Sequence, residues 1–201
     1  MIDSTKNIAT GHIIIKDKHT GEILVDKDNA IHNGNISYAI AKALAGDSSG
    51  FIKYMAFGNG GTQIDVTGNI AYKPANVSNI LDETAGLYSP SKVEISPGVF
   101  EDFRKDVTQL NDTNNFITTN TAGQNYADVV VTVTLTFGEP AGQDLTDGGT
   151  GTAAFDGEFV FDEIGLIEAG GNLLTHVIFH PVKKSSNREI EIEYTLRIQV
   201  S

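Results

Sequence analysis

Apolar and polar residues alternate most regularly at the end of the chain, between Arg188 and Val200. Because successive side chains of a strand point to opposite faces, this pattern predicts a long antiparallel strand with one dry and one wet face. A chain whose clearest pattern is core scaffold also points away from an enzyme. The dry positions are Ile190, Ile192, Tyr194, Leu196, Ile198 and Val200, and the wet ones are Glu189, Glu191, Glu193, Thr195, Arg197 and Gln199.

Other segments carry weaker strand signals. Residues 11–25 are typical of a hairpin, with Gly21 in its loop, and a polar link over 26–35 should follow. In 128–137 five apolar residues share one face: Val129, Val131, Val133, Leu135 and Phe137. The remaining strand candidates are 51–57, 92–96, 99–105, 158–167 and 173–180.

The sequence predicts one helix, over about residues 36–45. Asn33 or Asn35 is expected to cap its start, and Gly46 can end it with a left-handed residue. At about ten residues it depends on packing for stability. Its apolar stripe should comprise Ile36, Ile40 and Leu44, with Ala39 and Ala43 beside them.

Together these elements predict a mainly β protein: an antiparallel β-sandwich, jelly-roll-like or a meander, with one short α-helix packed on it. We expect one domain over residues 1–201, with Asn/Gly-rich excursions at about 58–90 and 138–157. Long excursions in compact domains are usually functional or form interfaces. The expected interface residues are Asn59, Gly60, Tyr72, Leu87, Tyr88 and Leu145.

Composition restricts the partners and the compartment. A formal net charge of −12 with scattered basic residues argues against nucleic acid. The chain has no cysteine, and no apolar run approaches a membrane span. Its first residues lack the basic-then-apolar pattern of a signal peptide, so we expect synthesis in a cytoplasm.

No segment completes a catalytic, cofactor or metal motif. His176 and His180 would lie roughly 13 Å apart along a strand, which favours structural roles over a shared ion. The glycines at 58–61 lack the Lys and the helix of a phosphate-binding loop. The acidic loops at 26–29 and 144–149 do not complete a calcium loop, and Asp162-Glu163 is uninformative without a pocket. We therefore expect no catalytic residues, cofactor or metal.

Several stretches in order resemble small β-rich virion proteins of tailed bacteriophages, of the neck, collar and tail-appendage kind. The resemblance covers most of the chain outside 63–90 and 138–157, and its motifs are short and structural. They are residues 17–24 (DKHTGEIL), 55–62 (MAFGNGGT), 161–166 (FDEIGL), 173–184 (LLTHVIFHPVKK) and 192–198 (IEYTLRI).

The resemblance implies a non-enzymatic structural subunit of a phage particle, in the neck or collar, that assembles as a homo-oligomeric ring. Its expected partners are copies of itself and other virion proteins: portal or connector, capsid or tail. The expected location is the virion, after synthesis in the host cytoplasm. The alternative is a capsid decoration, or a baseplate or fibre-associated module that binds carbohydrate or a receptor through end loops.

Overall fold

The computed structural model describes residues 7–107, 123–140, 159–185 and 187–200. Strands make up 54% of the described residues, which contain one helix, so the predicted mainly β, antiparallel sandwich is confirmed. Eight strands form the main sheet: β1 (Asn7–Asp17), β2 (Ile23–Ile31), β3 (Ile52–Gly58), β8 (Arg104–Asp106), β9 (Tyr126–Leu135), β10 (Val160–Glu168), β11 (Leu173–Lys183) and β12 (Ile190–Val200).

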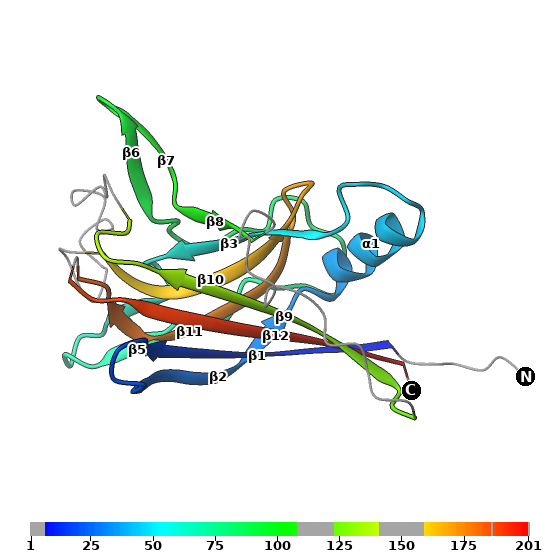
Figure 1. Ribbon diagram of the computed structural model, residues 1–201, viewed down its shortest axis with the longest axis horizontal. Helices are drawn as coiled ribbons and strands as arrows, with labels where there is room; N and C mark the ends of the chain where they lie inside the picture. The colour runs from blue at the N-terminus through cyan, green and yellow to red at the C-terminus, as the bar shows by residue number, and fades with distance from the viewer. Residues whose placement is uncertain (1–6, 108–122, 141–158, 186, 201) are drawn as a thin grey trace, which may run out of the picture.

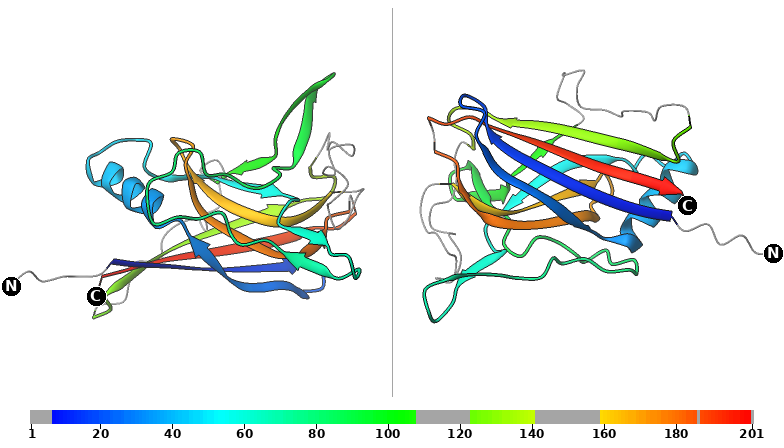
Figure 2. Two further views of the ribbon diagram at one scale, coloured as in Figure 1. Left: turned by 180° about the vertical axis from the view of Figure 1, so that it is seen from behind. Right: turned by 90° about the horizontal axis from the view of Figure 1, so that it is seen from below.

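The main sheet is folded over itself to make two layers. Its order is β8-β3-β10-β11-β2-β1-β12-β9, with antiparallel neighbours throughout. β2 belongs to both layers, because it pairs with β1 as far as Asn29 and with β11 through Ala30 and Ile31. The result is a nearly closed, barrel-like sandwich (Figures 1 and 2).

The partner switch in β2 depends on a glycine in β1. Asn29 lies opposite Gly11, and its side chain occupies the space that a Cβ on Gly11 would need. From there the Asn29 amide donates a hydrogen bond to the hydroxyl of Tyr194, whose side chain is fully buried. A polar contact thus crosses the interior where the two layers join.

Aromatic packing fills the core between the layers. Five phenylalanines contact one another with ring centroids 5.2–5.7 Å apart, in tilted and edge-to-face arrangements that aromatic pairs prefer. Aliphatic residues of β1, β9 and β12 face them across the sandwich. The five are Phe57, Phe103, Phe159, Phe161 and Phe179.

The terminal strand β12 lies as its pattern predicts. It is hydrogen-bonded on both sides, to β1 and to β9, over almost its whole length. Ile190, Ile192, Tyr194 and Leu196 are buried. This strand is therefore central to its layer, and the sandwich cannot close without it.

Helix α1 (Asn33–Leu44) stops before Gly46, which has the predicted left-handed conformation with φ of 77°, but the predicted N-terminal cap is wrong. His32 is the cap: its Nδ1 accepts a hydrogen bond from the N–H of Asn35. Asn35 is buried instead, where its amide donates to the carbonyls of Leu173 and Asp82 at 2.8 and 2.9 Å. Because buried polar groups need hydrogen-bond partners, the Asn35 side chain is committed to these contacts and does not cap the helix.

The predicted apolar stripe of α1 packs on the sandwich only in its first half, where Ile40 is also partly buried. Ile36 and Ala39 are buried against Leu174 and Leu196, whereas Leu44 is 85% exposed. Only the first half of the helix lies on the sandwich.

Two further predictions are corrected. The polar link expected at 26–35 is largely strand, because Asp26 and Asp28 occupy the wet face of β2 opposite Ile14 and His12. Phe137 was expected on the buried face of 128–137, but β9 ends at Leu135 and Phe137 is exposed in the following turn.

Asp17 ties together the two turns at one end of the sandwich. Its carboxylate accepts hydrogen bonds from the N–H groups of His19 and Thr20 and from Nε of Arg188 at 2.8–3.0 Å. The Thr20 and Arg188 hydrogen bonds lower the pKa of Asp17 to about 2. A carboxylate whose folded-state pKa is lowered stabilises the fold above its ordinary pKa, and this contribution is lost as the pH falls towards 2.

We therefore expect Asp17→Asn to be less stable than the wild type at pH 7, with the difference vanishing near pH 2. Urea unfolding at pH 7, 4 and 2 measures this. An Asp28→Asn control, on an exposed side chain, should change the unfolding free energy at pH 7 by less than about 0.5 kcal/mol. A difference between Asp17→Asn and wild type that does not change with pH would contradict the role given to Asp17.

Candidate interaction surfaces

The excursion at 58–90 is held to the sandwich by two adjacent buried carboxylates of β10. Asp162 accepts hydrogen bonds from the N–H groups of Gly61 and Thr62, at 2.9 and 2.7 Å, and from the Thr62 hydroxyl. Burial raises the pKa of Asp162, and the three donors oppose that rise. Asp162 therefore fixes the first turn of the excursion.

Glu163 fixes the far end of the same excursion. Its two oxygens accept hydrogen bonds from the N–H groups of Tyr88 and Ser89 at 2.9 and 2.8 Å. Nε2 of His176 lies 2.8 Å from one of them, and both side chains are fully buried. Since Nδ1 of His176 accepts from the N–H of Asn76 at 2.9 Å, the proton of the neutral ring lies on Nε2 and is donated to Glu163.

The structure places the predicted interface residues of this excursion in two groups. Asn59, Gly60 and Leu87 lie against their own chain. Asn59 donates its N–H to the carbonyl of Ser89 at 2.9 Å, and Gly60 is buried under Ser89, where a Cβ would lie 2.6 Å from the serine side chain. Leu87 is half-buried over Gly165 of β10.

Tyr72 and Tyr88 form the second group, because they keep exposed surface. Tyr72 lies at the end of the short hairpin of β4 (Thr62–Ile64) and β5 (Ile70–Tyr72), and its hydroxyl is 3.3 Å from Nδ1 of His180. The Tyr88 hydroxyl donates to the carbonyl of Pro74 at 2.8 Å. A lysine ammonium lies over each ring, at 5.5 Å for Tyr72 and 4.7 Å for Tyr88. The last predicted interface residue, Leu145, lies outside the described residues.

A second surface is an arm that sequence reasoning did not single out. Among the described strands, β6 (Lys92–Ser96) and β7 (Val99–Asp102) pair only with each other, and they project from the body (Figure 1). The arm, residues 92–102, carries three exposed apolar side chains: Ile95, Val99 and Phe100 at 55%, 49% and 42% exposure. Alternation in 92–105 predicted the strands, but it gave no signal that they leave the sheet.

The arm is fixed at its base rather than at its tip. The N–H of Ser91 donates to the carbonyl of Phe57 at 2.9 Å, and Phe103 donates to the carbonyl of Ser91 at 2.6 Å. Lys92 and Asp102 form an ion pair where the arm leaves the body. A two-stranded hairpin is marginally stable alone in water, so the apolar tip has most to gain from a neighbouring surface.

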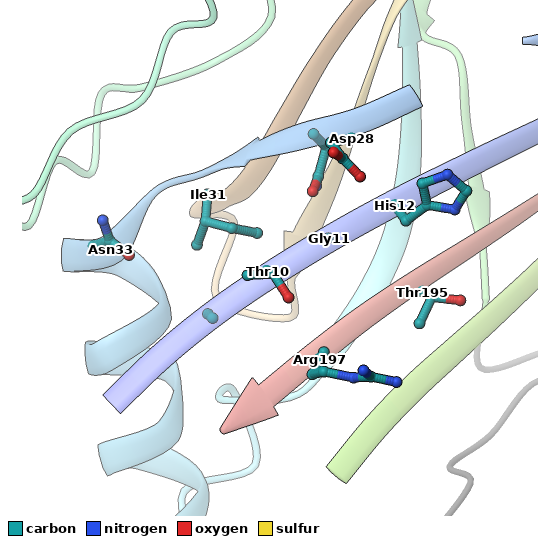
Figure 3. A pocket seen from close by; sticks show the side chains of 10 residues that line it. Thr10, Gly11, His12, Asp28, Ile31, Asn33, Thr195 and Arg197 are labelled. Atoms are coloured by element: carbon teal, nitrogen blue, oxygen red, sulfur yellow. The ribbon is translucent and has the colours of Figure 1, made fainter. Parts of the chain in front are cut away.

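A cavity of about 710 Å³ lies where β2 leaves β1, beside the start of α1 (Figure 3). Both of its basic groups are already paired. Arg197 makes two 2.7 Å hydrogen bonds to Asp128 and stacks 3.8 Å from the Tyr126 ring, and His12 lies 2.8 Å from Asp26. The Arg197 hydrogen bond lowers the pKa of Asp128, as expected for a stable pair.

In the described part of the chain, no three His, Asp or Glu side chains are grouped closely enough to hold a metal ion. Over the same residues, no helix has the length and apolar character needed to cross a bilayer. No protein-family model, curated protein or solved structure matches the chain.

The carboxylate of Glu163 can be tested directly. Glu163→Gln keeps one acceptor oxygen but turns an NH₂ group toward donors, either the Tyr88 N–H and the His176 ring or the Ser89 N–H. Leaving buried donors unsatisfied should reduce the unfolding free energy by about 3 kcal/mol and speed hydrogen exchange at Tyr88 and Ser89.

Urea unfolding and amide exchange read by mass spectrometry give both quantities. Glu193→Gln, on the exposed face of β12, is the matched control and should change neither by much. Equal stability of the two variants would mean that Glu163 does not hold the excursion in place.

Proposed function

We propose that this protein is a non-enzymatic structural subunit of a tailed phage particle, of the neck or collar, that assembles with copies of itself into a ring. The observation that carries the proposal is the arm. Three apolar side chains gather on a projecting two-stranded element, where exposure to water has a cost and contact with a neighbour removes it.

The way the body uses its polar groups supports a structural role. Asp162, Glu163 and His176 are all buried, and their hydrogen bonds fix the excursion at 58–90 to the sandwich. The two basic side chains that line the cavity beside α1, Arg197 and His12, are paired with the chain's own carboxylates. Ionisable groups committed in this way stabilise a shape and are not poised to react.

Charge and geometry fit an assembly of many copies. A net charge of −12 keeps free subunits apart in solution. An arm that docks on a different surface of the next subunit makes a heterologous contact, and such contacts close into rings when the rotation permits. The arm lies at one end of the body and the exposed end of α1 at the other, so one molecule presents distinct surfaces in two directions (Figure 1).

The alternative function, a carbohydrate- or receptor-binding module, would use Tyr72 and Tyr88. Both rings keep exposed surface, which favours this alternative, but each has a lysine ammonium over one face. Sugars stack on open aromatic faces, and the Tyr88 ring is restricted further because its centroid lies 5.6 Å from that of the buried His176 ring. Glycan-array binding that is lost in Tyr72→Ala and Tyr88→Ala would favour this function over the structural one.

The arm is tested by Ile95→Ser combined with Phe100→Ser. We expect the double variant to lose ring-sized assemblies at concentrations where the wild type forms them, because the apolar contact is removed, while its thermal unfolding changes little. Sedimentation velocity measures assembly. Leu44→Ser, which removes an exposed leucine at the other end of the body, is the control and should assemble normally.

A wild-type protein that stays monomeric at every concentration would contradict self-assembly. Location of the chain in a reconstruction of intact particles tests the phage assignment itself. Density for this sandwich outside the neck, on the capsid surface or baseplate, would favour the decoration or receptor-binding alternative.

A further inference from the structure

The main sheet has two edge strands, and they differ in the features that block pairing with another chain. β8 is one edge, and its three residues, Arg104, Lys105 and Asp106, are all charged. β9 is the other, with ten residues from Tyr126 to Leu135 that pair with β12 on one side and with no described strand on the other. Short, charged edges discourage added strands, and long uncharged ones accept them.

The composition of β9 favours strand addition. It contains no proline and no lysine, and six of its residues are valine or threonine, which favour strands. Its one charged residue, Asp128, is neutralised by the two hydrogen bonds from Arg197 on β12. Among the described residues, this edge therefore has backbone groups with no strand partner and no net charge that would repel a neighbour.

The occupant that β9 fits is β9 of a second copy. Antiparallel pairing about a two-fold axis at Val130 places Val130 opposite Val130, Asp128 opposite Thr132 and Tyr126 opposite Thr134. This register keeps buried-face residues opposite buried-face residues, as the strand period requires. It also sets no acid opposite an acid, which matters for two chains that each carry a charge of −12.

We propose that two copies of this protein pair through β9 in this antiparallel register. The four-stranded layer β2-β1-β12-β9 then continues into its symmetry mate. The contact adds a two-fold interface to the proposed function, distinct from the arm contact, and it rests on self-association but not on the phage assignment. Two-fold contacts of this isologous kind are the commonest in soluble homo-oligomers.

The absence of cysteine makes the register directly testable. Directly opposite Cα atoms of paired antiparallel strands lie about 4.5–5.5 Å apart, which is within disulfide range. Val130→Cys should therefore form a disulfide-linked dimer under mild oxidation. Thr134→Cys should not, because its two copies would lie roughly 27 Å apart along the strands.

A mixture gives a second, independent reading of the register. Tyr126→Cys and Thr134→Cys should each stay uncrosslinked alone and should form a mixed disulfide together. If Val130→Cys crosslinks no better than Thr134→Cys, or the mixture forms no mixed disulfide, the proposed pairing is wrong.

A charge variant tests the same contact without disulfide crosslinking. In the arm variant, which should keep only the β9 contact, Val130→Lys sets two ammonium groups opposite each other, and we expect the sedimenting species to shift from a dimer to the 21.5 kDa monomer. Ile14→Lys, on the outer face of the interior strand β1, is the matched control and should leave the dimer intact. A monomeric wild type whose β9 amides are protected from exchange would mean that the chain covers its own edge, and would overturn the proposal.

The outcomes separate this proposal from the arm. Loss of ring-sized assemblies in the arm variant, with a dimer and the Val130→Cys crosslink retained, would support both contacts as distinct interfaces. Normal assembly in the arm variant with the crosslink retained would support only the β9 contact, and a missing crosslink with arm-dependent assembly would support only the arm.

Discussion

The partner switch of β2 at Asn29–Ala30 is the constraint on which the sandwich depends. Up to Asn29 the strand hydrogen-bonds to β1, and from Ala30 it hydrogen-bonds to β11, so one strand carries both layers. The switch is possible because Gly11 leaves room for the Asn29 side chain to reach the buried Tyr194 hydroxyl. Burial raises the pKa of Tyr194, so the hydroxyl stays a neutral partner at this junction. The sheet therefore folds over an interior polar contact, and the aromatic core fills the space it encloses.

Buried polar contacts also hold the excursion at 58–90 in place. Irregular backbone has no strand partner for its N–H groups, and unsatisfied buried donors are costly. Here buried carboxylates of β10 accept five hydrogen bonds from excursion residues 61, 62, 88 and 89. Acidic residues that suggest catalysis in a sequence are thus used as acceptors for a loop. This use makes the excursion a fixed part of the surface, with Tyr72 and Tyr88 held in defined positions on it.

The sequence predicts the strands that show period-two alternation, but it predicts few of the side-chain contacts between residues far apart in the chain. It predicts β12, both strands of the arm and the end of α1 at Gly46, because each has a local cause. It misassigns the helix cap, because the Asn35 side chain hydrogen-bonds to the carbonyls of Leu173 and Asp82, which are far away in the chain. It assigns the polar half of β2 to a link, because a run of Asp, Lys and Asn on a wet face has the composition of a loop. Gly60, a predicted interface residue, is buried under Ser89. The sequence does not indicate this burial, because the two residues are far apart in the chain.

Exposed sheet edges and apolar hairpin tips promote unwanted association, and β proteins ordinarily protect them. In the described part of this chain, only the β8 edge is protected in this way. β8 is three residues long and fully charged, whereas β9 has ten residues with its one charge neutralised inside its own layer. The arm likewise exposes apolar side chains, and it does so on a two-stranded hairpin, which is only marginally stable by itself in water. A high negative charge offsets both hazards at a distance, where it opposes random encounter, but it acts weakly once backbone hydrogen bonds and apolar contacts form. The proposed self-association is therefore selective, because only contacts that bury a particular edge or tip gain enough to overcome the repulsion.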